Sequence, residues 1–143
     1  MYAKLSWTAI LWALLSTQTH AQDAWGALVV CCYSENGSHS GNGNSCGEGV
    51  STGFGSGATQ EAARASATNN AMSDTDQSSN WKCHAVRDFN HGCGYIAEGC
   101  NEVTKQCGWA IGVNQKDALM KLSRQGYAGG GGEHARGGGC VAR

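Results

Sequence analysis

Two segments of this chain carry small apolar residues at helical spacing, and each follows a short apolar run. The helical segments are 59–72, with Ala63, Ala67 and Ala71, and 115–125, with Ala118, Leu119 and Leu122. The runs Trp25–Val30 and Cys93–Ala97 have the length and apolar character of strands. We therefore expect two helices, each packing a narrow apolar stripe on a sheet.

An internal alignment relates the two halves of the chain. Segment 53–63 aligns without gaps on segment 108–118. In both copies a short strand runs through a glycine into a helix, whose N-cap is Thr59 or Asn114. The pattern predicts a strand–strand–helix–strand unit used twice, in a small disulfide-stabilised α+β domain with its helices on a mainly antiparallel sheet. The alternative is a chance match of glycine-rich sequence, because only one segment aligns without gaps.

The first 21 residues have the pattern of a removable export signal. Lys4 supplies the positive charge, residues 7–15 supply the apolar core, and Ala21 is the small residue before the cut. That apolar core is about half of the roughly 20 residues that a membrane-spanning helix needs. We therefore expect cleavage near Ala21–Gln22 and a single mature domain, residues 22–143, in the periplasm or outside the cell.

All the cysteines follow the expected cleavage site, and their even number indicates a disulfide framework. The eight are Cys31, Cys32, Cys46, Cys83, Cys93, Cys100, Cys107 and Cys140. Loop closure favours Cys100–Cys107, and either Cys31 or Cys32 with Cys46, with Cys32–Cys46 preferred; the other pairings stay open. No Cys-x-x-Cys pair occurs in the sequence, so we expect no metal site.

Glycine-rich stretches punctuate the chain. Residues 35–49 and 129–139 are dense in glycine. The first is predicted to be a long hairpin loop, and the second a flexible segment unless Cys140 pins it. Gly53-x-Gly55-x-Gly57 is similar to a dinucleotide-binding fingerprint, but its spacing fails because residue 58 is alanine. We expect these glycines to permit close contact between helix and sheet, and we expect no cofactor.

The charge balance excludes some partners. The full chain has a net charge of −1, and removal of Lys4 with the signal brings it to −2. A nucleic-acid-binding domain normally carries a basic face, so we expect no nucleic acid as partner. The sequence also has no polybasic run for anionic lipid.

Several of these features occur together in a recognisable order. Trp25-Gly-Ala is followed by a glycine-bounded strand and an alanine-rich helix, and then by Cys83-x5-Phe89-x3-Cys93-Gly-Tyr-Ile-Ala97. In this the chain resembles the secreted bacterial family called domain of unknown function 4189, over Trp25–Val30 and Thr52–Cys140. The resemblance implies a small exported α+β domain of bacteria, with no catalytic residues or cofactor to carry over.

The chain also departs from that family. Family members often place a cysteine at the end of the first helix, and residues 69–72 contain none. Five cysteines are additional to the family pattern, so its bridges do not transfer directly; they are Cys31, Cys32, Cys46, Cys100 and Cys107.

Candidate catalytic groups cluster around one predicted strand. His84 and Asp88 are four residues apart, so on a regular strand they share a face and Asp88 can orient His84 as a general base. His91 lies close by in sequence. Glu98 and Glu102 form an alternative pair of carboxylates, as glycoside hydrolysis requires. An ordinary polar surface is the simpler explanation of all five residues.

The combined features favour binding over catalysis. A cross-linked scaffold with glycine-rich loops and no coherent catalytic constellation predicts an exported, non-enzymatic module that recognises another protein or an envelope component. Inhibitor or immunity proteins and small secreted effectors fit this description. Trp81, at the end of a polar loop, is the candidate anchor for a partner. The alternatives are a small secreted hydrolase using His84 and Asp88, and a structural envelope protein.

Overall fold

The computed structural model describes residues 24–35, 44–127 and 134–142. The expected signal segment 1–21 and parts of both glycine-rich stretches lie outside these ranges. The described elements are β1 (Trp25–Tyr33), β2 (Ser45–Gly47), β3 (Gly49–Gly57), α1 (Gln60–Met72), β4 (Trp81–Phe89), β5 (Gly92–Cys100), β6 (Cys107–Gly112), α2 (Gln115–Arg124) and β7 (His134–Val141). The α+β class and both helices match the sequence analysis.

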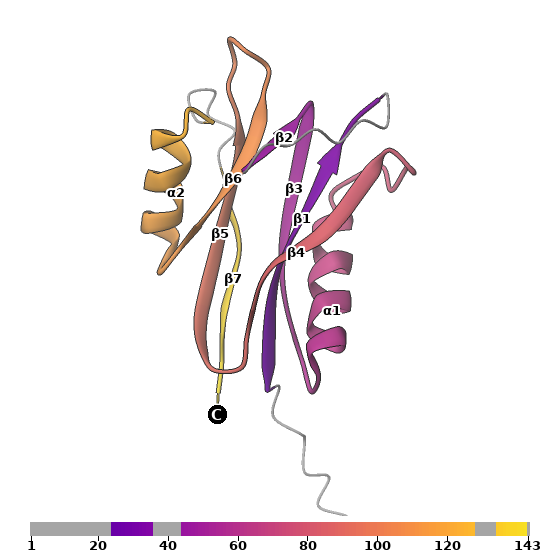
Figure 1. The fold of residues 1–143 in the computed structure, drawn as a ribbon, viewed down its shortest axis with the longest axis vertical. Helices are drawn as coiled ribbons and strands as arrows, with labels where there is room; N and C mark the ends of the chain where they lie inside the picture. The colour runs from indigo at the N-terminus through magenta and orange to yellow at the C-terminus, as the bar shows by residue number, and fades with distance from the viewer. Residues whose placement is uncertain (1–23, 36–43, 128–133, 143) are drawn as a thin grey trace, which may run out of the picture.

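The strands form two antiparallel sheets, whereas the sequence analysis predicted one. The first sheet has the order β3-β1-β4 and the second the order β2-β6-β5-β7. Figure 1 shows the sheets face to face, with α1 outside the first and α2 outside the second, so the fold has four layers. Consecutive residues of β1 from Gly26 to Cys32 are all buried, because α1 covers one face of this strand and the second sheet covers the other.

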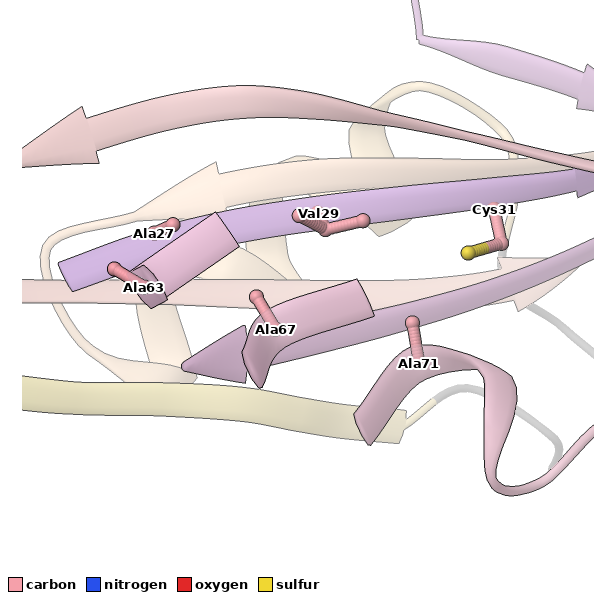
Figure 2. Packing of buried hydrophobic residues seen from close by; sticks show 6 residues of the cluster. All are labelled: Ala27, Val29, Cys31, Ala63, Ala67 and Ala71. Atoms are coloured by element: carbon pink, nitrogen blue, oxygen red, sulfur yellow. The ribbon is translucent and has the colours of Figure 1, made fainter. Parts of the chain in front are cut away.

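The buried residues of the helix α1 are all alanines. Ala63, Ala67 and Ala71 are fully buried against the apolar face of β1 (Figure 2). Such small side chains bring the helix backbone down onto β3. A Cβ atom added at Gly55 would lie 2.1 Å from the backbone nitrogen of Ala67. The glycines of the Gly-x-Gly-x-Gly stretch thus lie directly under a helix.

A second core lies between the two sheets. Its largest fully buried side chains are Leu28, Val30 and Ile96, and the ring of Phe54 stacks on that of Phe89 with centroids 6.2 Å apart. A third cluster, around Leu122, joins α2 to the second sheet. The described helices include none that is long and apolar enough to cross a membrane.

Four disulfides cross-link the strands. The bridges are Cys31–Cys83, Cys32–Cys46, Cys93–Cys140 and Cys100–Cys107. Cys32–Cys46 and Cys100–Cys107 are the two pairs that loop closure favoured. The adjacent Cys31 and Cys32 point to opposite faces of β1, so one bridges to β4 and the other to β2.

Residues 134–139, which were expected to be flexible unless Cys140 pinned them, belong to β7. This strand pairs antiparallel with β5, and the Cys93–Cys140 bridge holds its end. Similarly, Ser45–Gly47 of the predicted long loop forms β2, which pairs with β6. In both cases strand pairing and a disulfide supply the order that the glycine-rich sequence does not indicate.

Candidate functional site

His84 and Asp88 lie on opposite faces of the first sheet. The cross-strand partner of His84 is Val30, whose side chain faces the second sheet. The cross-strand partner of Asp88 is Ala27, whose side chain faces α1. Paired residues of neighbouring strands have their side chains on the same face. The cause is a β-bulge: Leu28 pairs with Arg87 but the next residue, Val29, pairs with Ala85. An extra residue in one strand reverses the alternation of its side chains. The predicted shared face is therefore wrong, and Asp88 does not orient His84.

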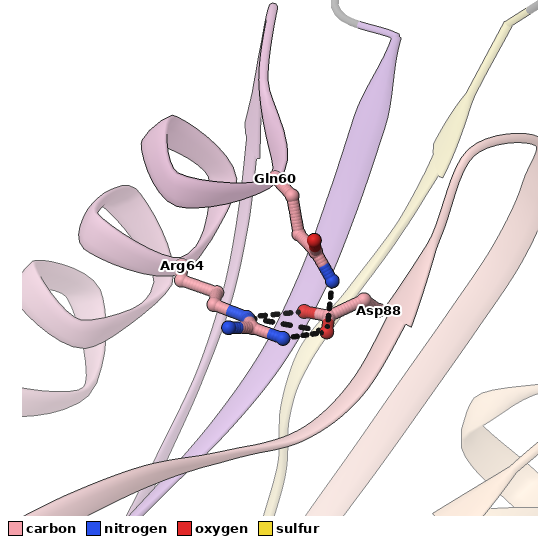
Figure 3. Close-up of polar contacts among 3 residues, drawn as sticks. All are labelled: Gln60, Arg64 and Asp88. Carbon is pink, nitrogen blue, oxygen red and sulfur yellow. Dashed lines mark hydrogen bonds and ion pairs between the residues drawn. The ribbon is translucent and has the colours of Figure 1, made fainter.

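Asp88 instead joins β4 to α1 (Figure 3). Gln60 Nε2 donates to its Oδ2 at 2.8 Å, and Arg64 Nε donates to its Oδ1 at 3.0 Å. A second Arg64 nitrogen, Nη2, forms an ion pair with Oδ2. The hydrogen bonds from Arg64 lower the pKa of Asp88 below its ordinary value, with a smaller contribution from Gln60 and against the effect of partial burial. The carboxylate is a structural acceptor.

The remaining catalytic candidates do not converge either. His91 is exposed in the turn between β4 and β5, where its Nδ1 lies 2.8 Å from Asn90 Oδ1. Glu98 is buried on β5, on the face toward the first sheet, while Glu102 is exposed in the loop that follows. The structure does not bring these residues together as an acid–base pair.

Trp81 takes part in packing. Its ring lies 5.3 Å from that of Tyr33, centroid to centroid, and its Nε1 donates to Asp76 Oδ1 at 2.9 Å. Hydrogen bonds from the Ser78 backbone nitrogen and from the Trp81 side chain hold the pKa of Asp76 below its ordinary value. The indole is partly buried against the alanine-rich core beneath α1.

A short loop at the tip of the β5–β6 hairpin carries the most exposed large apolar side chain of the described residues. We call residues 101–106 the clamped loop, because the Cys100–Cys107 disulfide closes its base. It projects beyond the ends of the neighbouring strands (Figure 1). At its centre Val103 is 91% exposed. The other exposed large apolar side chains of the described residues are those of Val113 and Met120, which are 74% and 42% exposed.

One side chain organises the clamped loop from inside. Asn101 Oδ1 accepts hydrogen bonds from the backbone nitrogens of Val103, at 2.9 Å, and Thr104, at 3.0 Å. The Asn101 backbone carbonyl accepts from Lys105 at 2.9 Å. Asn101 Nδ2 donates to the Gly126 carbonyl at 2.9 Å, which ties the loop to the end of α2. Asparagine commonly fixes turns by bonding to amides a few residues ahead.

The sequence analysis recognised the cysteine-closed turn but named no binding residue in it. The signal was a single valine among polar residues, in Asn101-Glu-Val-Thr-Lys-Gln106 between two cysteines. An apolar side chain at that position has no core to enter, because the loop is too short to fold back on the sheet.

Within the described ranges, His, Cys, Asp and Glu side chains form no group of three that could hold a metal ion. The clamped loop presents the exposed apolar side chain of Val103, with the side chains of Glu102 and Lys105 exposed beside it. No protein-family model, curated protein or solved structure matches this chain.

Proposed function

We propose that this chain is an exported, non-enzymatic binding protein whose recognition element for a protein partner is the clamped loop. The observation that carries this proposal is the 91% exposure of Val103 on a loop closed by a disulfide. Transfer of an exposed apolar side chain from water into an apolar pocket of a partner is favourable, so the exposure of Val103 favours association.

The rigidity of the loop favours binding. Ordering a flexible loop opposes association by about 0.5–1.5 kcal/mol for each immobilised side chain. Here the Asn101 hydrogen bonds and the Cys100–Cys107 bridge hold the backbone before any partner arrives. The partner that fits is a protein with a small apolar pocket for Val103. Glu102 and Lys105 are exposed beside Val103. They suit a partner whose pocket is surrounded by charges of both signs.

The backbone of the loop argues against one form of inhibition. An inhibitor that enters a protease cleft as an extended strand uses free backbone groups to pair with the enzyme. The Val103 and Thr104 nitrogens are already bonded to Asn101, and the Lys105 nitrogen closes a tight turn. The proposed mode is therefore insertion of the Val103 side chain, which suits an immunity protein, another inhibitor or an effector.

Export is part of the proposal. The pattern of residues 1–21 supports a cleaved signal, with the mature chain beginning near Gln22. Four disulfides fit an oxidising compartment such as the periplasm or the medium. The resemblance to domain of unknown function 4189 points to the same setting.

We also infer that the chain contains one unit used twice. The series β1-β3-α1-β4 and β5-β6-α2-β7 form sheets of the same internal order. The first series carries a bridge between β1 and β4, and the second a bridge between β5 and β7. A Cβ added at Gly57 or at the aligned Gly112 would meet the backbone nitrogen of Ala63 or the aligned Ala118, at 2.9 and 2.3 Å. The clamped loop has no counterpart bridge between β1 and β3, so it is an elaboration of the second unit.

A capture experiment tests the proposed function. Oxidised protein purified from the exported fraction is immobilised and exposed to envelope extract and culture fluid, alongside Val103→Asp and Val113→Asp variants. Val113 is the matched control, because it is also exposed and precedes the N-terminus of α2, where a negative charge is tolerated. We expect one partner to be retained by the unsubstituted and Val113→Asp proteins and lost from Val103→Asp. Failure of the unsubstituted protein to retain any partner contradicts the proposal.

A further inference from the structure

A shallow pocket lies beside the clamped loop, where the end of α2 meets the start of β2. Its volume is about 360 Å³, and the described residues that line it are Asn44, Gln125 and Tyr127. That volume is within the range of roughly 300–1,000 Å³ typical of small-molecule sites. These lining residues comprise two carboxamides and a phenol, and none carries a charge at neutral pH.

The aromatic wall of this pocket is held in place by the backbone. Gly126, with a φ of 86°, ends α2 in the left-handed conformation and turns the chain back. The Tyr127 nitrogen then donates to the Leu122 carbonyl at 3.3 Å. The ring lies against Gly108 of β6, where an added Cβ would come within 2.4 Å of it. Tyr127 is therefore positioned before any ligand binds.

The two carboxamides are anchored in the same way. The Asn44 carbonyl accepts from the Trp109 nitrogen at 3.0 Å, and the Gln125 nitrogen donates to the Lys121 carbonyl at 3.1 Å. Between the side chains there is one long contact, from Asn44 Nδ2 to Gln125 Oε1 at 3.4 Å. Each carboxamide has two donor hydrogens and an acceptor oxygen with two lone pairs, so both keep capacity for a ligand.

From this arrangement we propose that the pocket binds a neutral sugar. Sugar hydroxyls both donate and accept, which matches the mixed donors and acceptors of Asn44 and Gln125. One face of a pyranose ring presents C–H groups, and these pack on an aromatic ring such as that of Tyr127. The site is separate from Val103, so it adds a second ligand to the proposed function.

The test is an NMR titration of the oxidised, ¹⁵N-labelled protein purified from the exported fraction. The probes are the β-1,4-linked dimer of N-acetylglucosamine and, in a second arm, maltose. We expect saturable shifts of the Asn44 and Gln125 side-chain amide signals with one probe or both. A response to the first probe assigns an N-acetylated glycan, and a response to maltose assigns a neutral hexose chain; either supports a sugar site.

Variants separate specific binding from a general effect. Gln125→Ala should weaken binding about fivefold, as expected for one lost hydrogen bond. Tyr127→Phe should retain binding, because stacking does not need the hydroxyl, and Tyr127→Ala should abolish it. Gln115→Ala, at the other end of α2, is the control and should bind as the unsubstituted protein does. The absence of any saturable shift, or equal binding by Gln125→Ala, overturns the inference. Neither result bears on the capture experiment with Val103, so the two proposals fail independently.

Discussion

His84 and Asp88 are separated by three residues in β4, yet their side chains lie on opposite faces of the first sheet. The bulge around Val86 takes up one residue, and this shifts Asp88 toward α1, where Arg64 binds it. Asp88, which the sequence suggested as the partner of a catalytic base, thus fastens α1 to β4. This relationship leads to a prediction about stability at low pH.

Replacement of Asp88 by Asn should lower the free energy of unfolding by about 1 kcal/mol near neutral pH, because the bond is partly screened by solvent around Arg64. The folded pKa of Asp88 is depressed, so its contribution is complete above the unfolded value of about 3.9 and is lost as the pH falls through the folded pKa. Urea denaturation of both proteins should show the full difference near neutral pH and a progressively smaller difference as the pH falls below about 3.9. A difference that persisted unchanged at low pH, or an equal effect from Glu102→Gln on the exposed loop, would contradict this assignment.

Gly55→Ala should destabilise the protein by about 3 kcal/mol, since the added methyl meets the backbone of α1 and not a movable side chain. Ala65→Ser, on the exposed side of the same helix, should cost less than about 0.5 kcal/mol. Thermal denaturation of both variants measures the two effects. Equal melting temperatures would mean that α1 does not lie directly on β3.

The two caps offer a test of the internal repeat. Thr59 Oγ1 accepts from the Ala62 nitrogen at 3.1 Å, and Asn114 Oδ1 accepts from the Asp117 nitrogen at 2.8 Å. Thr59→Ala and Asn114→Ala should each lower the free energy of unfolding by about 1 kcal/mol, as loss of an N-cap usually does. If only one of them changes stability, the two helices are not begun in the same way.

The disulfide bridges should contribute different amounts to the free energy of unfolding. In the chain-entropy model, a bridge that closes a longer loop restricts the unfolded chain more. The Cys31–Cys83 bridge spans 52 residues and the Cys100–Cys107 bridge spans 7. Replacing both cysteines by serine should therefore lower the free energy of unfolding by about 4 kcal/mol for Cys31–Cys83 and by about 2.5 kcal/mol for Cys100–Cys107. A larger loss from the shorter bridge, measured by urea denaturation, would show that the clamped loop stabilises the fold by another route.

The local pattern of residues was sufficient to predict much of the fold. The alanine spacing and the caps placed the helices to within one residue at each end, at 60–72 and 115–124. The contiguous apolar run of β1 also contained a signal for two-sided burial, since a strand covered on one face only would alternate apolar and polar residues. A run of this kind indicates that both faces of the strand are covered, but it does not show which elements cover them.

Other features depend on contacts between distant residues. The bulge in β4 follows from its register with β1, and no local motif in residues 81–89 marks it. The order of β7 comes from pairing with β5 and from Cys93–Cys140. The pocket at Asn44 and Tyr127 joins residues that are far apart in sequence, so spacing alone could not reveal it.

The measurement that tests the central claim most directly is site-specific photo-crosslinking from the clamped loop. A benzophenone side chain replaces Val103 in one protein and Val113 in the other, and each is irradiated in the exported fraction. The account predicts that the probe at position 103 forms a single major adduct with a protein partner, while the probe at position 113 does not form it. No adduct at position 103, or the same adduct in equal yield from both positions, would contradict the assignment of the clamped loop as the recognition element.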